Sequence, residues 1–497
     1  MKINQFRNKT FVLIVFLSPL LFQACHQLDK SAKSPADPVF DKISSYLDWE
    51  EQNGFSGIIS IKIKDQPIFS RTFGYANKEK QIPISNQTVF DIGSLTKQFT
   101  ASGILKLEIE GKLSVEDTLG KFFPDIPEDK RSINLHQLLT HTSGLIKSVG
   151  NDYKRTNKSD FLNSLFSSEL ISDPGTSYQY SHAGYSLLGA VIEKVSGMTY
   201  EEYLNEKLFK PAGMEHTGYV IPLWEEGNVA NGYRKCEDWG KPMDMPWSTD
   251  GPYWNLKANG GMISSSSDLM SWMKAMEGTR ILSEAEKEKL FFPHVKEGKK
   301  ANSYYSYGWV ILKSSRDTKV IAHNGGNRRF YTDLINYKTE EVTILLLSNV
   351  DKPGNDNISW ELAKIIFWPN FEPKVQGAVQ ECLDSLPENR IGEVAGKFLA
   401  MLNTDEPIND LSVLDGLFAD YLKKKHSPGH IQEVLNNLKQ NYRQIKIDHV
   451  TVTDHRIMDL NLSYMEEGSR KSLFMRLIFD EEDNYLIRML MYNTSTR

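Results

Sequence analysis

The first predicted elements come from two different spacings of hydrophobic residues near the start of the chain. Apolar residues recur at helical intervals from Phe40 onward, and Ile59, Ile61 and Ile63 then alternate with polar positions. A period of two is typical of a half-buried strand. The polar turn KDQP at residues 64–67 therefore predicts a β-hairpin with the apolar segment that follows it.

Helical spacing dominates residues 94 to about 300, where long loops rich in Gly, Pro, Ser and Trp separate the helices. Strand-like segments return at residues 305–315, 318–326 and 341–350. Two early strands and three late ones that flank a helical insert predict one antiparallel sheet with helices packed on it. The expected fold class is therefore α+β.

The hydrophobic pattern breaks at residues 367–376, and the remainder reads as a separate small domain over residues 375–497. Helical spacing covers Ile391 to Leu402 and Leu411 to Leu422. Strand-like segments follow at residues 456–465, 472–480 and 485–492. This part of the chain holds no group of residues typical of catalysis, so we expect a small α+β domain of unknown role.

The first 25 residues have the pattern of an export signal. Three basic residues precede a mostly apolar run at residues 11–22, which is too short to span a membrane comfortably. The sequence LLFQAC resembles a bacterial lipoprotein cleavage site with Cys25 as the lipidated residue, and an ordinary cleaved signal peptide is the alternative. Either way we expect an exported protein, periplasmic or anchored in the outer membrane through Cys25, with residues 26–38 as a polar tether.

Composition narrows the classes of partner. The chain has 497 residues, of which 40% are hydrophobic and 25% charged, an ordinary globular balance for two or three domains. A formal net charge of −6 gives no reason to expect nucleic acid as a partner. Cys236 and Cys382 are too few for a disulfide scaffold and lack metal-site spacing, so no metal is expected, and whether the two pair is left open.

Ser94 and Lys97 stand out at the start of a helix that is apolar from Phe99 onward. Residues three apart share a helix face, so the lysine amine can reach the serine hydroxyl. A serine needs a neighbouring base to act as a nucleophile, and a lysine can be that base where burial and nearby positive charge lower its pKa. The alternative is a helix cap beside a solvated lysine.

Six sequence blocks occur in one order and carry a resemblance to a known family. They read FDIGSLTKQFTA, LEIEGKLSVEDTLGKFFPDIP, INLHQLLTHTSGL, YQYSHAGYSLLGAVIEKVSG, LFKPAGMEHTGY and NGGMISSSSDLMSWM. The series resembles the penicillin-recognising serine hydrolases: class C β-lactamases, D-alanyl-D-alanine carboxypeptidases, esterases and D-aminopeptidases, with their Ser-x-x-Lys signature. The resemblance implies a β-lactamase/transpeptidase-like fold, with a helical subdomain beside the sheet, over residues 39–368. It also implies acyl-enzyme chemistry that needs no cofactor.

The resemblance assigns roles to four residues. Ser94 resembles the family nucleophile and Lys97 its partner amine. Tyr180 occupies the position of a tyrosine that could act as base and later as proton donor to the leaving group, and a core tyrosine is the alternative. His182 stands where the family usually has an asparagine that contacts the substrate's amide. Because a histidine lacks the amide's adjacent donor and acceptor, we expect a positioning role rather than a general base, and poor recognition of standard β-lactam amides.

The third motif of the family corresponds to His323 and Gly325 in the segment VIAHNGG. A histidine here resembles the esterase and peptidase branches, and it could hydrogen-bond into the site or, when protonated, hold a substrate carboxylate. The resemblance also implies an oxyanion hole formed by the N–H groups of Gly326 and Ser94. Glycines let the backbone approach that closely.

Other residues have two interpretations each. Arg328 and Arg329 could clamp a substrate carboxylate or could be solvated charges. Four aromatic residues of one loop could form the wall of a substrate cleft or could pack within the loop. They are Trp239, Trp247, Tyr253 and Trp254. His136 and His141 belong to a structural block of the family, where we expect a core or loop-bonding role.

The sequence therefore predicts an exported serine hydrolase that acts through an acyl-enzyme on Ser94. The expected substrate is a small peptide, amide or ester, with D-amino-acid peptidase or esterase activity favoured over true β-lactamase activity. The alternative is a penicillin-binding or sensing protein of the same fold that does not turn over. Neither the substrate itself nor the oligomeric state can be read from the sequence.

Overall fold

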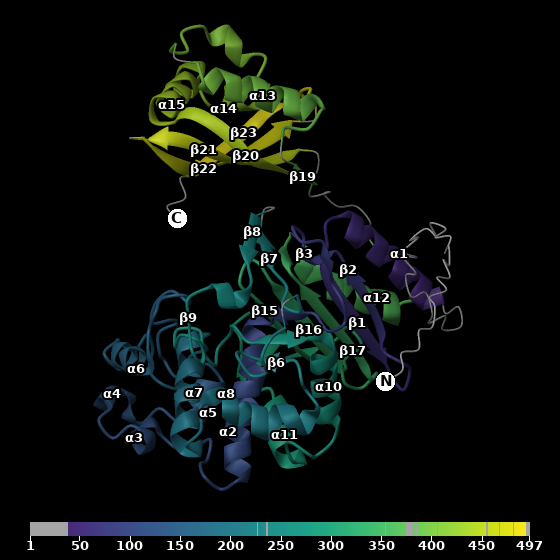
Figure 1. Cartoon of the computed structure of the whole chain (residues 1–497), viewed down its shortest axis with the longest axis vertical. Helices are drawn as coiled ribbons and strands as arrows, with labels where there is room; N and C mark the ends of the chain where they lie inside the picture. Colours follow the sequence, from purple (N-terminus) through teal and green to yellow (C-terminus); the bar gives the residue numbers. More distant parts are fainter. Residues whose placement is uncertain are drawn as a thin grey trace, which may run out of the picture.

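The two ends of the larger unit lie side by side in one sheet of the computed structural model of the chain (Figure 1). The structure describes residues 38–493 except 226, 235–236, 353, 374–380, 384, 405, 454–455, 467 and 481. The strand order is β12-β13-β14-β15-β16-β17-β1-β2 and every pairing is antiparallel. The bounds are β12 Val295–Lys296, β13 Ser303–Tyr305, β14 Val310–Lys313, β15 Lys319–Gly326, β16 Tyr331–Tyr337, β17 Val342–Ser348, β1 Gly57–Ile63 and β2 Phe69–Phe73.

The predicted joining of an early hairpin with late strands in one sheet is confirmed, because β1 pairs with β17 from Gly57 opposite Ser348 to Ile63 opposite Val342. The single strand predicted at residues 305–315 is confirmed only over β14, Val310–Lys313, and its predicted extent is wrong. Gly308 has a φ of +75°, and Ser306 N–H donates to Trp309 O at 2.7 Å, so a tight turn separates β13 from β14.

Both faces of this sheet are covered, so its central strands carry apolar residues on both faces. Alternate residues of a strand point to opposite faces. Ile59 and Ile344 pack with α1 (Pro38–Gln52) and α12 (Asn355–Phe367). Leu345 belongs to the core shared with the helical subdomain on the other side.

The helical subdomain is built around α2 (Thr96–Ile109), which is buried from Thr96 to Leu105. Gly103 lets α2 approach α7 closely, since a Cβ there would lie 3.1 Å from Ile192. The other helices are α3 Leu119–Phe122, α4 Glu128–Arg131, α5 Leu135–Leu139, α6 Lys158–Phe166, α7 His182–Ser196, α8 Tyr200–Leu204, α9 Lys210–Ala212, α10 Ser266–Glu277 and α11 Glu284–Phe291. Two segments are 3₁₀ helices, η1 Gly93–Leu95 and η3 Pro242–Asp244, and one is a π-helix, η2 Asn205–Phe209. Small sheets join β5 Val89–Asp91, β11 Ile263–Ser265 and β6 Thr217–Gly218; β18 Val350–Asp351, β7 Gly232–Arg234 and β8 Glu237–Gly240; β3 Tyr75–Asn77 and β4 Ile82–Pro83; β9 Trp247–Ser248 and β10 Gly251–Pro252.

The smaller unit is a curved antiparallel sheet with helices on one face (Figure 1). Its strands run in the order β19 Glu381–Leu383, β20 Arg443–Thr453, β21 Ile457–Glu466, β22 Ser469–Asp480 and β23 Leu486–Asn493. Its helices are α13 Arg390–Leu402, η4 Leu411–Leu414, α14 Asp420–Lys425 and α15 Pro428–Asn441. Phe398, Leu435 and Leu460 are among the buried residues of its own core.

The helix predicted from Leu411 to Leu422 is wrong. Ile487 N–H donates to Leu417 O at 2.8 Å, and Ala419 N–H donates to Ile487 O at 3.0 Å. These bonds hold residues 417–419 extended along β23, so the helical pattern is divided into η4 and α14.

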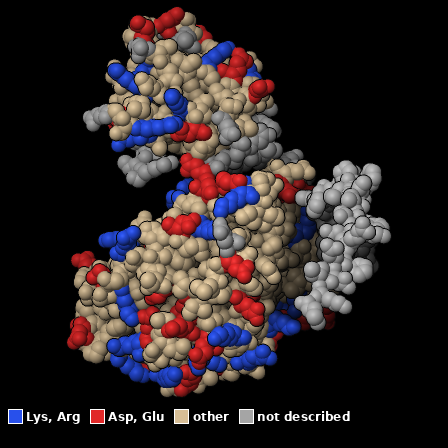
Figure 2. Space-filling model, viewed as in Figure 1, with Lys and Arg blue, Asp and Glu red and all other residues tan. Residues whose placement is uncertain are grey.

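Some predictions fall where the structure makes no statement. The signal peptide, Cys25, Cys236 and the side chain of Cys382 lie outside the described residues. Within the described parts of residues 38–493, no helix is long and apolar enough to cross a membrane. On the face shown in Figure 2, acidic and basic side chains are intermingled over the larger unit.

Candidate active site

Ser94 lies on the one-turn 3₁₀ helix η1, which runs directly into α2. Asp91, at the end of β5, accepts a hydrogen bond from Gly93 N–H at 2.7 Å. Gly93 has a φ of +51°, a conformation that favours glycine. Thr96 Oγ1 then donates to Gly93 O at 2.8 Å. The serine is therefore presented by a tight turn rather than by the helix itself.

Lys97 is fully buried beneath this turn. Its Nζ donates to Ser94 Oγ at 3.1 Å and to the backbone oxygen of Asn259 at 2.6 Å. Burial lowers the pKa of Lys97 to about 7, against a weaker opposing effect of Asp152. At neutral pH, a large fraction of the protein molecules therefore has a neutral Lys97 amine within reach of the serine proton.

Tyr180 lies beside the same amine. Lys97 Nζ is 4.9 Å from the centroid of the Tyr180 ring. Burial raises the pKa of Tyr180 above its ordinary value, and hydrogen bonding with Ser94 and Tyr305 offsets only part of that rise. A raised pKa keeps the phenol protonated, so of the two roles considered for Tyr180 the structure favours proton donor over base.

The tautomer of His182 is fixed by Asn259. The Asn259 amide nitrogen donates to Asn255 O at 2.9 Å and to Ser186 Oγ at 2.8 Å. The Asn259 Oδ1 therefore faces His182 Nδ1, 3.2 Å away, and only a protonated Nδ1 can donate to it. Burial, with Lys97 as the next cause, lowers the pKa of His182 to about 3. His182 is a neutral imidazole whose Nε2 is a hydrogen-bond acceptor.

His323 is likewise neutral. Its Nδ1 donates to Asn324 O at 2.6 Å, so its Nε2 accepts from the Tyr305 hydroxyl at 3.1 Å. Burial, with Lys97 as the next cause, lowers the pKa of His323 to about 4. Because its two nitrogens are bonded within the protein and its pKa is lowered, the structure favours His323 as a hydrogen-bonding residue of the site over a cationic partner for a substrate carboxylate.

Glycines bring β15 against the Ser94 turn. A Cβ on Gly325 would lie 2.8 Å from Ser94 N and 2.2 Å from Ile92 O. A Cβ on Gly93 would lie 2.4 Å from Gly326 N. The backbone nitrogens of Ser94 and Gly326 therefore come together at one junction, where two donors could face one oxygen.

These residues line one open pocket of about 350 Å³. Its lining consists of Ser94, Lys147, Tyr180, His182, Glu297, Tyr305, Val310, His323, Asn324, Gly325, Gly326 and Tyr331. All of the predicted site residues in the described part of the chain reach the pocket except Lys97, which lies beneath it. Lys147, Glu297 and Tyr305 were not predicted, and neither was Asn259, which bonds both Lys97 and His182.

The two arginines and four aromatic residues considered above are not among the lining residues. The Arg329 guanidinium lies 5.1 Å from the Trp239 ring centroid, and Trp254 is buried in the core. His136 Nδ1 bonds the Tyr307 hydroxyl at 2.7 Å, and His141 Nδ1 accepts from Ser181 N–H at 3.0 Å. Both histidines make the loop-bonding contacts that we expected.

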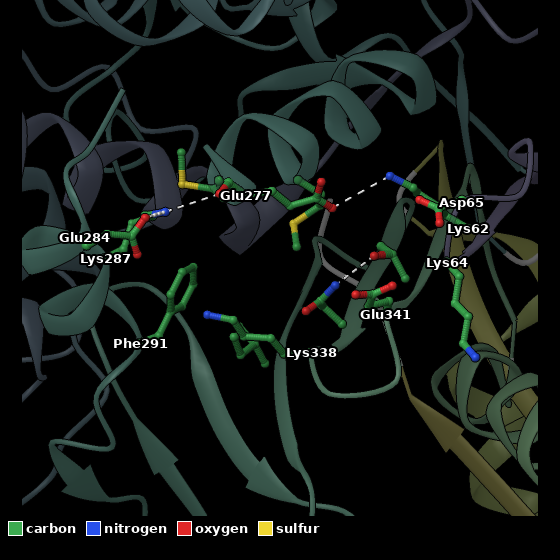
Figure 3. Close-up of a pocket in the computed structure, with 14 residues that line it drawn as sticks. Lys62, Lys64, Asp65, Glu277, Glu284, Lys287, Phe291, Lys338 and Glu341 are labelled. Atoms are coloured by element: carbon green, nitrogen blue, oxygen red, sulfur yellow. Dashed lines mark hydrogen bonds and ion pairs between the residues drawn. The ribbon is translucent and has the colours of Figure 1, made fainter. Parts of the chain in front are cut away.

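A second pocket, of about 400 Å³, lies between the sheet and helices α10 and α11 (Figure 3). Four of its charged side chains form two ion pairs: Lys62 lies 3.7 Å from Glu277, and Lys287 lies 2.5 Å from Glu284. It contains no serine–lysine pair. Among the described residues, no group of His, Cys, Asp or Glu side chains is arranged to hold a metal ion.

Comparisons with known proteins agree with this geometry. The Beta-lactamase family model matches residues 49–366. Penicillin-binding protein 4* of Bacillus subtilis (strain 168) is 30% identical over 317 residues, which are 61% of this chain and 70% of that protein. The D-amino acid amidase of Ochrobactrum anthropi SV3, solved with D-phenylalanine, superposes with a TM-score of 0.57 at 20% identity, over 66% of this chain and 99% of that one. The octameric penicillin-binding protein homologue from Pyrococcus abyssi superposes with a TM-score of 0.58 at 21% identity, over 91% of this chain and 100% of that one.

Proposed function

Because this chain belongs to the beta-lactamase family and is a serine hydrolase of that superfamily, we propose that it acts on a small amide, peptide or ester through an acyl-enzyme on Ser94. The observation that carries the proposal is the contact of 3.1 Å between Lys97 Nζ and Ser94 Oγ, with the pKa of Lys97 lowered to about 7. A neutral amine at that distance can accept the serine proton as the hydroxyl attacks.

The proposed reaction has two halves. Ser94 Oγ attacks the substrate carbonyl carbon while Lys97 takes its proton, and the N–H groups of Ser94 and Gly326 hold the oxyanion. The bond to the leaving amine or alcohol then breaks, Tyr180 gives its proton to that group, and Lys97 reprotonates Tyr180. Water hydrolyses the acyl-enzyme in the second half, returning the Ser94 hydroxyl.

We favour D-amino-acid peptides, amides or esters over β-lactams as substrates. The neutral His323 and the acceptor nitrogen of His182 do not supply the cation and amide donor that an acylamino β-lactam would use. The shared fold with a D-amino acid amidase is compatible with an amide substrate. A non-turnover penicillin-binding or sensing role is the second candidate, motivated by His182 and by the additional C-terminal unit.

The first test is mass-spectrometric acylation of the fragment that begins at residue 39, with four probes: a p-nitrophenyl ester, a D-Ala-D-Ala peptide, a D-amino-acid amide and a penicillin. A Ser94→Ala variant should form no adduct. Ser102→Ala is the matched control, because Ser102 lies on α2 with a buried hydroxyl that has no partner. An adduct that never turns over would favour the sensing role, and no adduct at all would contradict both candidates.

Export and lipid anchoring through Cys25 form a separate part of the proposal, motivated by the basic and apolar pattern of residues 1–25. The Cys25→Ala variant of the full chain should move from the membrane fraction to the soluble fraction. Unchanged fractionation would contradict the anchor and leave the hydrolase proposal untouched.

A further inference from the structure

A buried carboxylate joins the two backbone segments that meet at the pocket. Asp91 is 3% exposed. Its Oδ1 accepts from Gly93 N–H at 2.7 Å, and its Oδ2 accepts from the side-chain amide of Asn327 at 2.8 Å. Because Asn327 follows β15 directly, this one side chain bonds both the Ser94 turn and the end of the strand that carries Gly326.

The orientation of Asn327 is fixed by its own turn. Its Oδ1 accepts from Phe330 N–H at 2.9 Å and from Arg329 N–H at 3.1 Å. Backbone N–H groups can only donate, so the amide NH₂ of Asn327 must be the end that faces Asp91. Asp91 thus accepts from two donors at once, one on each carboxyl oxygen.

The bonds of Asp91 lie next to the two backbone nitrogens that converge on the pocket. Gly93 immediately precedes Ser94, and Gly326 immediately precedes Asn327. The two glycines approach so closely that a Cβ on Gly93 would lie 2.4 Å from Gly326 N. Any change in the Asp91–Asn327 bond therefore acts on the spacing of the Ser94 and Gly326 N–H groups.

We propose that Asp91 and Asn327 are positioning residues that set the separation of the Ser94 and Gly326 N–H donors, and thereby the stabilisation of the transition-state oxyanion. The inference rests on the proposed function of the same pocket. Neither residue lines the pocket, so both act on it through the backbone segments that they bond. Oxyanion donors act where charge develops, so their misplacement lowers kcat more than it raises KM.

The charge state of Asp91 agrees with this role. Burial raises the pKa of Asp91 to about 6, with Asp152 adding to the rise, while the bonds from Gly93 and Asn327 oppose it. The side chain is thus mainly an acceptor-only carboxylate at pH 7.5.

An exchange of the two side chains tests the proposal. Asp91→Asn places an amide donor against the amide donor of Asn327, and Asn327→Asp places two carboxylates together. The double variant D91N/N327D restores every bond with the roles reversed. The new amide at position 91 accepts from Gly93 N–H and donates to the new carboxylate at position 327, which in turn accepts from the N–H groups of Arg329 and Phe330.

Each single variant should lose about 10²-fold in kcat with KM within about threefold of wild type, since such small misplacements cost about that much. The double variant should recover to within about fivefold of wild-type kcat.

The chain offers a matched control. Asp238 accepts from Gly240 N–H at 2.7 Å and from the Asn231 amide at 2.8 Å, the same arrangement at a site that does not line the pocket. Asp238→Asn should leave kcat unchanged. If a single variant does not fold, Asn327→Ala replaces it, because this change removes only the amide that bonds Asp91. Its kcat should fall in the same way while its KM changes little.

The outcomes separate the two proposals. If the wild-type protein is active and the folded single variants keep the wild-type kcat, the positioning role is overturned and the proposed function stands. A double variant that is folded yet no better than the single variants also overturns it. A wild-type protein that turns over no substrate overturns the proposed function, and the positioning role with it.

Discussion

Lys97 donates to the backbone oxygen of Asn259 at 2.6 Å, and this bond holds the amine in place whichever protonation state it adopts. A neutral amine keeps N–H groups for the carbonyl and a lone pair for the Ser94 proton. Asn259 also bonds His182. One residue therefore fixes both the proposed base and the neighbouring imidazole.

The pH dependence of turnover follows from the pKa of Lys97, lowered by burial to about 7. Below that value the amine is protonated and cannot accept the serine proton, so kcat should rise with pH around a midpoint near 7. Lys97→Arg stays charged and should lose at least about 10²-fold in kcat. Initial rates between pH 5.5 and 9 check this, and a flat profile for wild type would contradict it.

The same buried amine should cost stability. The pKa of Lys97 is lower in the folded protein than in the unfolded chain, so the unfolded state binds more protons between about pH 7 and 10.5. The contribution of Lys97 to the free energy of unfolding therefore rises with pH across that window. Lys97→Met should therefore raise the melting temperature at pH 7, by about 2–4 °C per kcal/mol gained, with a smaller gain at pH 10. Thermal scans at both pH values measure it. Lys299→Met, at an exposed lysine, is the control and should change little.

His182→Asn should change which acyl groups the pocket accepts. The imidazole presents an acceptor, whereas an asparagine adds an N–H donor for a substrate carbonyl. Acylation by benzylpenicillin should rise relative to 6-aminopenicillanic acid, which lacks the acylamino carbonyl, by about 3–10-fold. The ratio of the two acylation rates is the measurement, with the exposed His426→Asn as control. An unchanged ratio would argue against this use of His182.

Gly325→Ala should damage both activity and stability. The added Cβ would lie 2.2 Å from Ile92 O, a backbone atom, so β15 must shift away from the Ser94 turn. We expect a loss of about 1–3 kcal/mol in the free energy of unfolding and of about 10²-fold in kcat. Gly429→Ala, on α15 with nothing within 4 Å of the new Cβ, should be neutral or slightly stabilising. Denaturant titration and initial rates of both variants decide the matter.

The local part of the site could be predicted because its members are close in sequence. Ser94 and Lys97 lie on consecutive turns, and His323 to Gly326 lie on one strand. Asn259 carries no such signal. It is separated by 162 residues from Lys97 and by 77 from His182, and only loop packing brings them together.

The fold was predictable where the hydrophobic pattern was clean. The apolar strand β17 and its partner β1 are confirmed, whereas β16 between β15 and β17 was not predicted. Thr332 and Asp333 interrupt its pattern, although both are buried. Burial raises the pKa of the Asp333 carboxyl to about 7. A polar residue buried within a strand cannot be recognised from hydrophobic periodicity.

The pocket draws its residues from segments that lie far apart along the chain. A cut between α7 and β13 would leave Ser94, Lys97 and Tyr180 on one piece, and His323 and the β15 glycines on the other. The two pieces share the central sheet, because β1 belongs to the first and β17 to the second. Neither piece could turn over substrate unless they reassociated through that sheet. Hydrolysis would then serve as a reporter of fragment complementation, with colour from a chromogenic ester marking each correctly rejoined molecule.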